Sequence, residues 1–301
     1  MLKHLVAFYT IGTTGWSQSR APGWTEKVPN ILLEETIWLA LAVVVAGGVS
    51  GILAGLFGVG GGTVIVPALY EVFRILDVPE GVRMQLCIGT SLAIMVPTSI
   101  RSYLAHRSKG AVIPDVILVW SLSAVVGVIV GSLVAVGAPT ALFKSAFIVF
   151  ATFIGTKMLF GSSWQVRTSL PGRVAQFGYG LLTGLVSSLV GVSGGSISNA
   201  VLTLYGQPIQ HAVATSAGIG VPITIIGTIG YVLAGWRHMP VLPPLSLGFV
   251  SLIGWVLMAP VSSYAASYGA KMAHLLSKRQ LEIAFGMFLI LVSARFIVSL
   301  L

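Results

Sequence analysis

The sequence alternates long apolar runs with short polar segments, and this pattern predicts membrane-spanning helices. Eight runs have 17 residues or more, about the length that a helix needs to cross a bilayer core roughly 30 Å thick. Two further apolar pieces, at 63–76 and 196–205, directly follow glycine clusters and are too short for a comfortable independent span. The eight predicted helices cover residues 37–57, 86–105, 113–136, 141–159, 174–190, 212–234, 241–264 and 281–300.

Composition supports the same fold class. Residues of the hydrophobic set make up 55% of the chain and charged residues only 8%, whereas a globular domain carries about 25% charged residues. We therefore predict an all-α, polytopic transmembrane helical bundle. The single cysteine, Cys87, excludes an intrachain disulfide and a cysteine metal cluster, and its expected role is that of a small buried apolar residue. We predict no metal site and no cofactor.

Residues 1–35 differ from the rest of the chain and are predicted to form an extramembrane or interfacial segment. One interpretation is a signal peptide, because Lys3 precedes a short apolar stretch and small residues lie near Ala21. The other is an interfacial amphipathic segment containing Trp16 and Trp24, which fits the sequence at least as well.

The chain also contains an internal repeat. The string GILAGLFGVGGGT at 51–63 matches GLVSSLVGVSGGS at 184–196, at a constant offset of 133 residues. A second string, CIGTSLAIMVP at 87–97, matches AVATSAGIGVP at 212–222 at an offset of 125. The predicted organisation is a first transmembrane repeat at 36–160, a basic cytoplasmic linker at 161–173 and a second transmembrane repeat at 174–301.

The charge distribution bears on partners and on topology. The net charge of +9 comes from 17 Lys and Arg against 8 Asp and Glu, and the basic residues lie mainly in short loops. This follows the positive-inside rule and argues against a nucleic-acid partner.

The loop charges also predict the topology, because three clusters of basic residues should all lie on the cytoplasmic side of the membrane. Counting the membrane crossings between these clusters gives five crossings per repeat if the piece at 196–205 also crosses the membrane. The halves are then inverted repeats of a multi-pass cell (inner) membrane protein with both termini outside. A re-entrant loop that returns to its own side would reverse this conclusion.

The glycine clusters that interrupt two apolar runs are the predicted substrate-binding site. In hydrocarbon every backbone polar group needs a partner, so such breaks are tolerated only where they face protein or a watery cavity. The short helix after each break presents free N–H groups and the positive end of its dipole, which favour an anion. The alternative is tight helix packing, which explains glycines such as Gly127 and Gly131. The predicted site residues at the breaks are Gly60, Gly61, Gly62 and Thr63 in the first copy, and Ser193, Gly194, Gly195, Ser196 and Asn199 in the second.

A repeated pair of hydroxyl residues extends the predicted site. Thr90 and Ser91 correspond to Thr215 and Ser216 in the second copy, and their hydroxyls can donate to an anion without a buried charge. The alternative is that each hydroxyl bonds back to the i−4 carbonyl or to a neighbouring helix.

Three further residues are predicted to be accessory. Gln85 precedes the first hydroxyl motif, and Arg101 follows it on the same helix as the candidate for a cationic vestibule. His211 is the candidate for a proton step, because histidine is the residue type that most often serves one near neutral pH, although an interfacial histidine is the commoner case. Arg101 and Lys144 both lie close enough to helix ends to snorkel towards solvent.

The positions of the acidic residues favour an anionic substrate. All eight fall in the N-terminal region, in loops or near predicted helix ends, so no carboxylate is placed to hold a cation at the membrane midplane. Cation transporters and proton relays usually need such a group.

The glycine and hydroxyl motifs together resemble the sulfite exporter TauE/SafE family. The resemblance rests on GLFGVGGGTVIVPAL at 55–69, its weaker echo LVGVSGGS at 189–196 and the two Thr-Ser strings. It covers nearly the whole chain from residue 37 and implies transport of sulfite, sulfoacetate or related sulfonates. The second copy departs from the pattern, with Ser193 in place of the middle glycine and Ala200 where the first copy has Pro67, which puts an equal role of the two halves in question.

We therefore predict a secondary transporter, not an enzyme, that exports a small sulfur-containing or organic anion by alternating access. The alternatives are proton-coupled uptake of such an anion, a membrane-embedded enzyme, and a scaffold or channel-like pore. The expected partners are the anionic substrate and membrane lipid, and the protein is expected to be a monomer or a homodimer.

Overall fold

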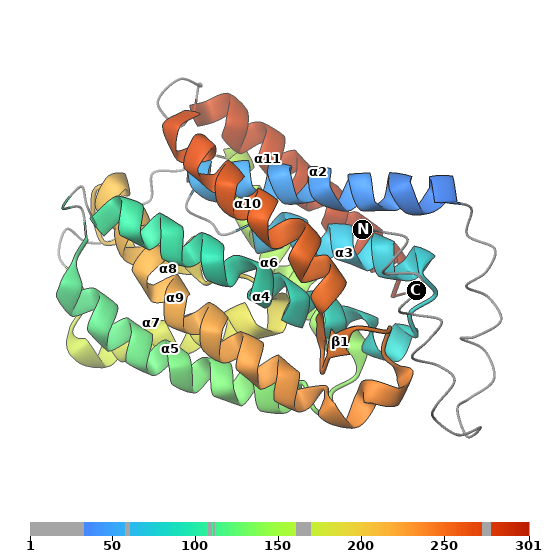
Figure 1. Cartoon of the computed structure of the whole chain (residues 1–301). Coiled ribbons are helices and arrows are strands. Elements are labelled where there is room, and N and C mark those ends of the chain that lie inside the picture. The colour runs from blue at the N-terminus through green and yellow to red at the C-terminus, as the bar shows by residue number, and fades with distance from the viewer. Residues whose placement is uncertain are drawn as a thin grey trace. The chain divides into compact units, whose positions relative to one another are not determined.

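The computed structural model describes residues 33–57, 61–107, 110, 112–160, 170–272 and 278–300 (Figure 1). The packing described below is that of the compact unit Leu39–Leu301. The predicted N-terminal segment up to residue 32, residues 161–169 of the predicted linker, and Gly60 lie outside the described residues. The helices are α2 (Leu33–Phe57), α3 (Gly62–Ile75), α4 (Glu80–Arg107), α5 (Pro114–Val134), α6 (Thr140–Phe160), α7 (Arg173–Val190), α8 (Gly195–Leu204), α9 (Ile209–Ala234), α10 (Leu252–Met272) and α11 (Lys278–Val298).

The all-α fold is confirmed, and each predicted apolar run contains a helix. Two of the helices, α3 and α8, are the short ones that follow the glycine clusters. Within the described ranges, three helical segments are by themselves long and apolar enough to cross a bilayer: Pro114–Val134, Thr140–Phe160 and Gln210–Val241.

The predicted start of one helix was wrong. The run 241–264 was expected to be helical throughout, but α10 begins only at Leu252. The preceding residues form a 3-10 helix (Trp236–Val241) and a small antiparallel pair of strands, β1 (Ser246–Leu247) and β2 (Val250–Ser251). Pro243 and Pro244 lack backbone N–H groups, and Gly248 has a positive φ of 54°, so an α-helix cannot continue through this segment.

Glycines allow two pairs of helices to pack closely, α2 with α10 and α7 with α5. A Cβ on Gly51 of α2 would overlap the carbonyl oxygen of Ser262 on α10, and a Cβ on Gly184 of α7 would overlap that of Ala124 on α5. Along both pairs the residue numbers rise together, so α2 runs parallel to α10 and α5 parallel to α7 (Figure 1). The packing role expected for Gly127 and Gly131 is confirmed, because both lie against α7. Each of three contacts between α2 and α10 has an equivalent between α7 and α5. Gly47–Met258 corresponds to Gly180–Trp120, Gly51–Ser262 to Gly184–Ala124, and Ile52–Gly269 to Leu185–Gly131.

Helix α4 occupies the middle of this packing. It contacts α3, α6, α9 and α10, and every residue from Met84 to Met95 is buried. Cys87 is one of these residues, as expected for a small apolar side chain. The hydroxyl motif of the first repeat therefore lies in the interior of the protein.

Candidate functional site

The two glycine breaks lie against each other. Helix α7 ends at Val190, and Gly191 and Gly194 then adopt positive φ angles of 77° and 75°, which glycine accepts without strain. At the other break, α3 begins at Gly62, and a Cβ on Gly62 would overlap the carbonyl oxygen of Gly191. The absence of a side chain at Gly62 thus allows the start of α3 to touch the break between α7 and α8.

At each glycine break a serine hydroxyl donates to a backbone carbonyl. Ser50 of α2 donates its hydroxyl to the Gly61 carbonyl at 3.0 Å. The Gly61 carbonyl also accepts from the backbone N–H groups of Val64 and Ile65 in α3, each at 3.0 Å. Ser91 of α4 donates to the Gly191 carbonyl at 2.9 Å, which ties the hydroxyl motif of the first repeat to the glycine break of the second. Among the predicted site residues, Ser91 is therefore the one that directly joins the two motifs.

Three buried hydroxyls beside the breaks have no hydrogen-bond partner in the described structure. Thr63 lies in the first turn of α3, and Ser198 lies near the start of α8. Ser187 belongs to the last turn of α7, and its Oγ lies 3.0 Å from the position that a Cβ on Gly194 would take. Each residue is at most 1% exposed. A buried hydroxyl without a partner costs free energy, so the grouping of these three hydroxyls around the breaks makes them candidates to bind a ligand.

Ser187 was not among the predicted site residues. It lies four residues before Gly191, and Thr183 lies a further four residues before it, so one face of α7 carries hydroxyls up to the break. That spacing is the sequence signal that would have found it.

The electrostatics of the breaks favour negative charge. Neither α3 nor α8 carries an acidic residue in its first turn. The amide N–H groups of a first turn have no intrahelical acceptor and carry the positive end of the helix dipole. The arrangement can therefore donate hydrogen bonds to an anion from backbone amides and from neutral hydroxyls.

The threonines of the two hydroxyl motifs make a reciprocal pair of contacts. Thr90 of α4 accepts a hydrogen bond from the backbone N–H of Ser251, just before α10, at 2.9 Å. Thr215 of α9 accepts one from the backbone N–H of Ile113, just before α5, at 3.1 Å. Each threonine oxygen thus accepts a hydrogen bond from the backbone N–H just before a helix of the other repeat. The hydroxyl hydrogen of the threonine stays available for another acceptor.

We expect Thr90→Val to destabilise the protein by about 1–3 kcal/mol, because the Ser251 N–H would stay buried without an acceptor. Thr90→Ser keeps the oxygen and should be close to wild type. Thr228→Val is the control, since the Thr228 hydroxyl only bonds back to Thr224 of its own helix. Thermal unfolding in detergent measures all three, and equal midpoints for Thr90→Val and Thr90→Ser would contradict this role.

The other predicted site residues lie in separate places. Ser193 and Gly194 contact Gly220 and Ile223 of α9, respectively. Gln85 donates to the Ala138 carbonyl at 3.3 Å, away from the breaks. The remaining placements are Gly195, Ser196 and Asn199 in α8, Ser216 bonded to the Val213 carbonyl of its own helix, His211 at the start of α9, and Arg101 on the exposed side of α4.

Lys144 does not snorkel to solvent as expected. Its side chain is only 2% exposed, and its Nζ lies 2.6 Å from Oε1 of Glu80 and 3.3 Å from the Ser299 carbonyl. The residue lies in the second turn of α6, where α4 and the C-terminal end of α11 cover it. The ion pair with Glu80 thus takes the place of water around the Lys144 ammonium.

Comparison with known proteins identifies the family of this chain. Residues 43–296 match the family model described as sulfite exporter TauE/SafE. A "Probable membrane transporter protein" of Haemophilus influenzae is 31% identical over 254 residues, which cover 84% of this chain and 96% of the relative. A protein of Methanocaldococcus jannaschii with the same description is 29% identical, covering 83% and 92% of the two chains. A further relative, from Bacillus subtilis, is 26% identical over 67% of this chain and 82% of its own length. The chain therefore belongs to the sulfite exporter TauE/SafE family of membrane transporters.

Proposed function

We propose that this transporter carries a small anion through a site where the two glycine breaks meet. The observation that carries the proposal is the contact between Gly62 and Gly191, flanked by the unpartnered hydroxyls of Thr63, Ser187 and Ser198. Neutral donors suit an anion that must bind and then leave, because they add no fixed buried charge to hold it.

The substrate class and the direction of transport are part of the same proposal. The family description names sulfite export, and we propose sulfite, sulfoacetate or a related sulfonate as the substrate. Exit of an anion from a cell that is negative inside is favoured by about 2.3 kcal/mol per charge per 100 mV. Export therefore needs no coupled ion.

We further propose that the two halves are inverted repeats in the inner membrane, with both termini outside. The equivalent packing of α2 with α10, and of α5 with α7, supports a twofold relation between the halves, and the parity of the basic loop clusters supports their inversion. These contacts pair a helix of one half with a helix of the other, and the two sets are equivalent. Movement of one half against the other would open the shared site to each side in turn.

The unpartnered hydroxyls provide a test that separates binding from folding. Thr63→Val and Ser187→Ala remove hydroxyls that have no protein partner, so the free energy of unfolding should stay the same or rise. Anion affinity should fall at least about tenfold for each variant, because a hydrogen bond to a charged group is lost. The measurements are sulfite and sulfonate flux in proteoliposomes and thermal stabilisation by the same anions.

Two matched variants control this experiment. Ser293→Ala removes a buried, unpartnered hydroxyl from α11, which packs against α6, and should leave anion affinity unchanged. Ser91→Ala removes a hydroxyl that does have a partner, so stability should fall. Wild-type flux and affinity in both Thr63→Val and Ser187→Ala would exclude the site.

A further inference from the structure

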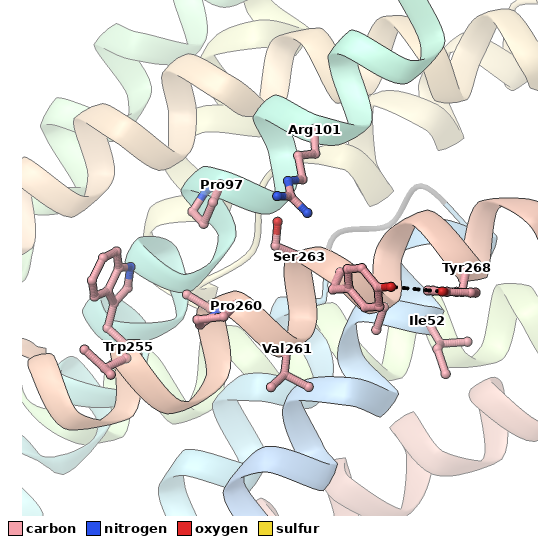
Figure 2. Close-up of a pocket in the computed structure, with 12 residues that line it drawn as sticks. Ile52, Pro97, Arg101, Trp255, Pro260, Val261, Ser263 and Tyr268 are labelled. Atoms are coloured by element: carbon pink, nitrogen blue, oxygen red, sulfur yellow. Dashed lines mark hydrogen bonds between the residues drawn. The ribbon is translucent and has the colours of Figure 1, made fainter. Parts of the chain in front are cut away.

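A groove that is separate from the glycine breaks runs between α4 and α10. It has a volume of about 890 Å³, and Ile52 of α2 closes one side (Figure 2). Its walls are aliphatic and aromatic along most of the length, with Val256 58% exposed at the rim. A long apolar groove on the outside of a membrane protein faces lipid, not water.

Two prolines that face each other shape this groove. Pro97 of α4 has no N–H for the carbonyl of Ala93, four residues earlier, and Trp255 Nε1 of α10 donates to that carbonyl instead, at 3.1 Å. Pro260 interrupts α10 at the level of the groove in the same way (Figure 2). Each proline interrupts the hydrogen bonding of its helix and favours a bend there. The groove is thus a consequence of residues in both helices, and Trp255 closes its inner end.

Polar groups gather at the other end of the groove. Arg101 is exposed there and makes no ion pair or hydrogen bond with any part of the chain that the structure describes. Figure 2 shows the hydroxyl of Ser263 pointing towards the Arg101 guanidinium. Ser263 is only 4% exposed and its Oγ has no hydrogen-bond partner among the described residues. Tyr264 and Tyr268 complete this end, with their hydroxyl oxygens 3.1 Å apart.

The polar end lies on the side of the membrane where α4 terminates. Arg101 precedes Arg107, the last residue of α4, by six residues, which is about 9 Å along the helix axis. His106 and Arg107 make this end of α4 basic, and tyrosines are typical of the interface between hydrocarbon and headgroups. An occupant of the groove would therefore have an anionic group at the interface and a long apolar part directed into the bilayer.

We propose that the groove binds an anionic phospholipid. Its phosphate would bind Arg101 and Ser263, and one acyl chain would follow Val256 and Ala259 towards Trp255. Basic pockets between transmembrane helices suit anionic headgroups, and the free guanidinium and the free hydroxyl together supply the donors that a phosphate needs. This site does not depend on the proposed transport site, because none of its lining residues belongs to the glycine breaks.

Native mass spectrometry and thermal unfolding of the purified full chain test the proposal with two lipids of identical acyl chains. Phosphatidylglycerol should bind the wild type about fivefold more tightly than phosphatidylcholine, the effect expected of one interfacial arginine. Arg101→Gln should remove this preference, whereas the matched control Arg107→Gln, on the same helix but outside the groove, should keep it.

A second variant tests the apolar part of the groove independently of the Arg101 charge. Val256→Trp adds bulk at the exposed rim and should lower occupancy by both lipids without changing the unfolding midpoint of the lipid-free protein. A retained preference for phosphatidylglycerol in Arg101→Gln overturns the proposal, as does equal binding of both lipids to the wild type. A lipid-free dimer that Val256→Trp dissociates would also overturn it, because a second copy of the chain would then fill the groove.

Discussion

Gly62→Ala is expected to unfold the protein or to trap it without transport, because the added Cβ would overlap the Gly191 carbonyl oxygen. The same Cβ would lie 3.0 Å from the Cα of Val192, so the added methyl meets the peptide unit that joins Gly191 to Val192, and no flexible side chain can move away. The start of α3 would have to move away from the second break. We expect a loss of stability of at least about 3 kcal/mol, the upper part of the usual range for overpacking. Thermal unfolding in detergent and anion flux in proteoliposomes measure the two effects.

Gly81→Ala is the matched control for this substitution. Gly81 lies in the first turn of α4, and a Cβ there would meet no atom within 4 Å. The variant should therefore be as stable as the wild type or slightly more stable, since alanine favours a helix more than glycine does. A Gly62→Ala protein with wild-type stability and flux would show that the two breaks do not pack as closely as described here.

Much of this fold could be predicted from hydrophobic runs, because membrane helices must be long and apolar. The short helices α3 and α8 were predicted from the glycine clusters before them, and both were found. The error at residues 241–251 has a local cause. Val241, Leu242 and Leu245 are apolar, but the prolines between them interrupt the backbone hydrogen bonding, and hydropathy does not measure that interruption.

The contacts between the two halves could not be predicted in the same way. The matching strings place Thr90 over Thr215, but not the partners of these threonines, Ser251 and Ile113, because the partners depend on how the halves pack. The absence of hydrogen-bond partners at Ser187 is likewise a three-dimensional property. The sequence shows which residues carry hydroxyls. Whether a buried hydroxyl has a hydrogen-bond partner depends on residues that are distant in the chain.

Lys144 shows the same limit for charged residues. A lysine close to a helix end was expected to reach solvent, but the C-terminal end of α11 covers it. Its partner, Glu80, comes from the start of α4, 64 residues earlier, and no local pattern links the two. Through the Lys144 ammonium, the ion pair with Glu80 and the hydrogen bond to the Ser299 carbonyl join α6, α4 and the segment after α11.

Glu80→Gln is expected to destabilise the protein more than Lys144→Met does. Without the carboxylate, the Lys144 ammonium would stay buried with neutral groups only, among them the Ser299 carbonyl at 3.3 Å and the Tyr70 side chain, and buried charges that have lost their counter-charge cost about 3 kcal/mol or more. Without the lysine, the Glu80 side chain is 60% exposed and keeps its hydration, so the loss should stay near 1 kcal/mol. Glu71→Gln, which alters the partly exposed ion pairs with Arg74 and Arg295, is the control and should cost less than Glu80→Gln, about 1 kcal/mol.

The pH dependence of unfolding provides an independent measurement of the same ion pair. The hydrogen bond from Lys144 lowers the pKa of Glu80 below its ordinary value of 4.5. A carboxyl whose pKa is lower in the folded protein binds fewer protons there than in the unfolded chain, so its contribution to stability is fully present above pH 4.5. That contribution is lost as the pH falls through the lower, folded pKa. The wild type should therefore lose more stability than Glu80→Gln between pH 6 and pH 3, and parallel curves for the two proteins would mean that Glu80 does not hold Lys144 in solution.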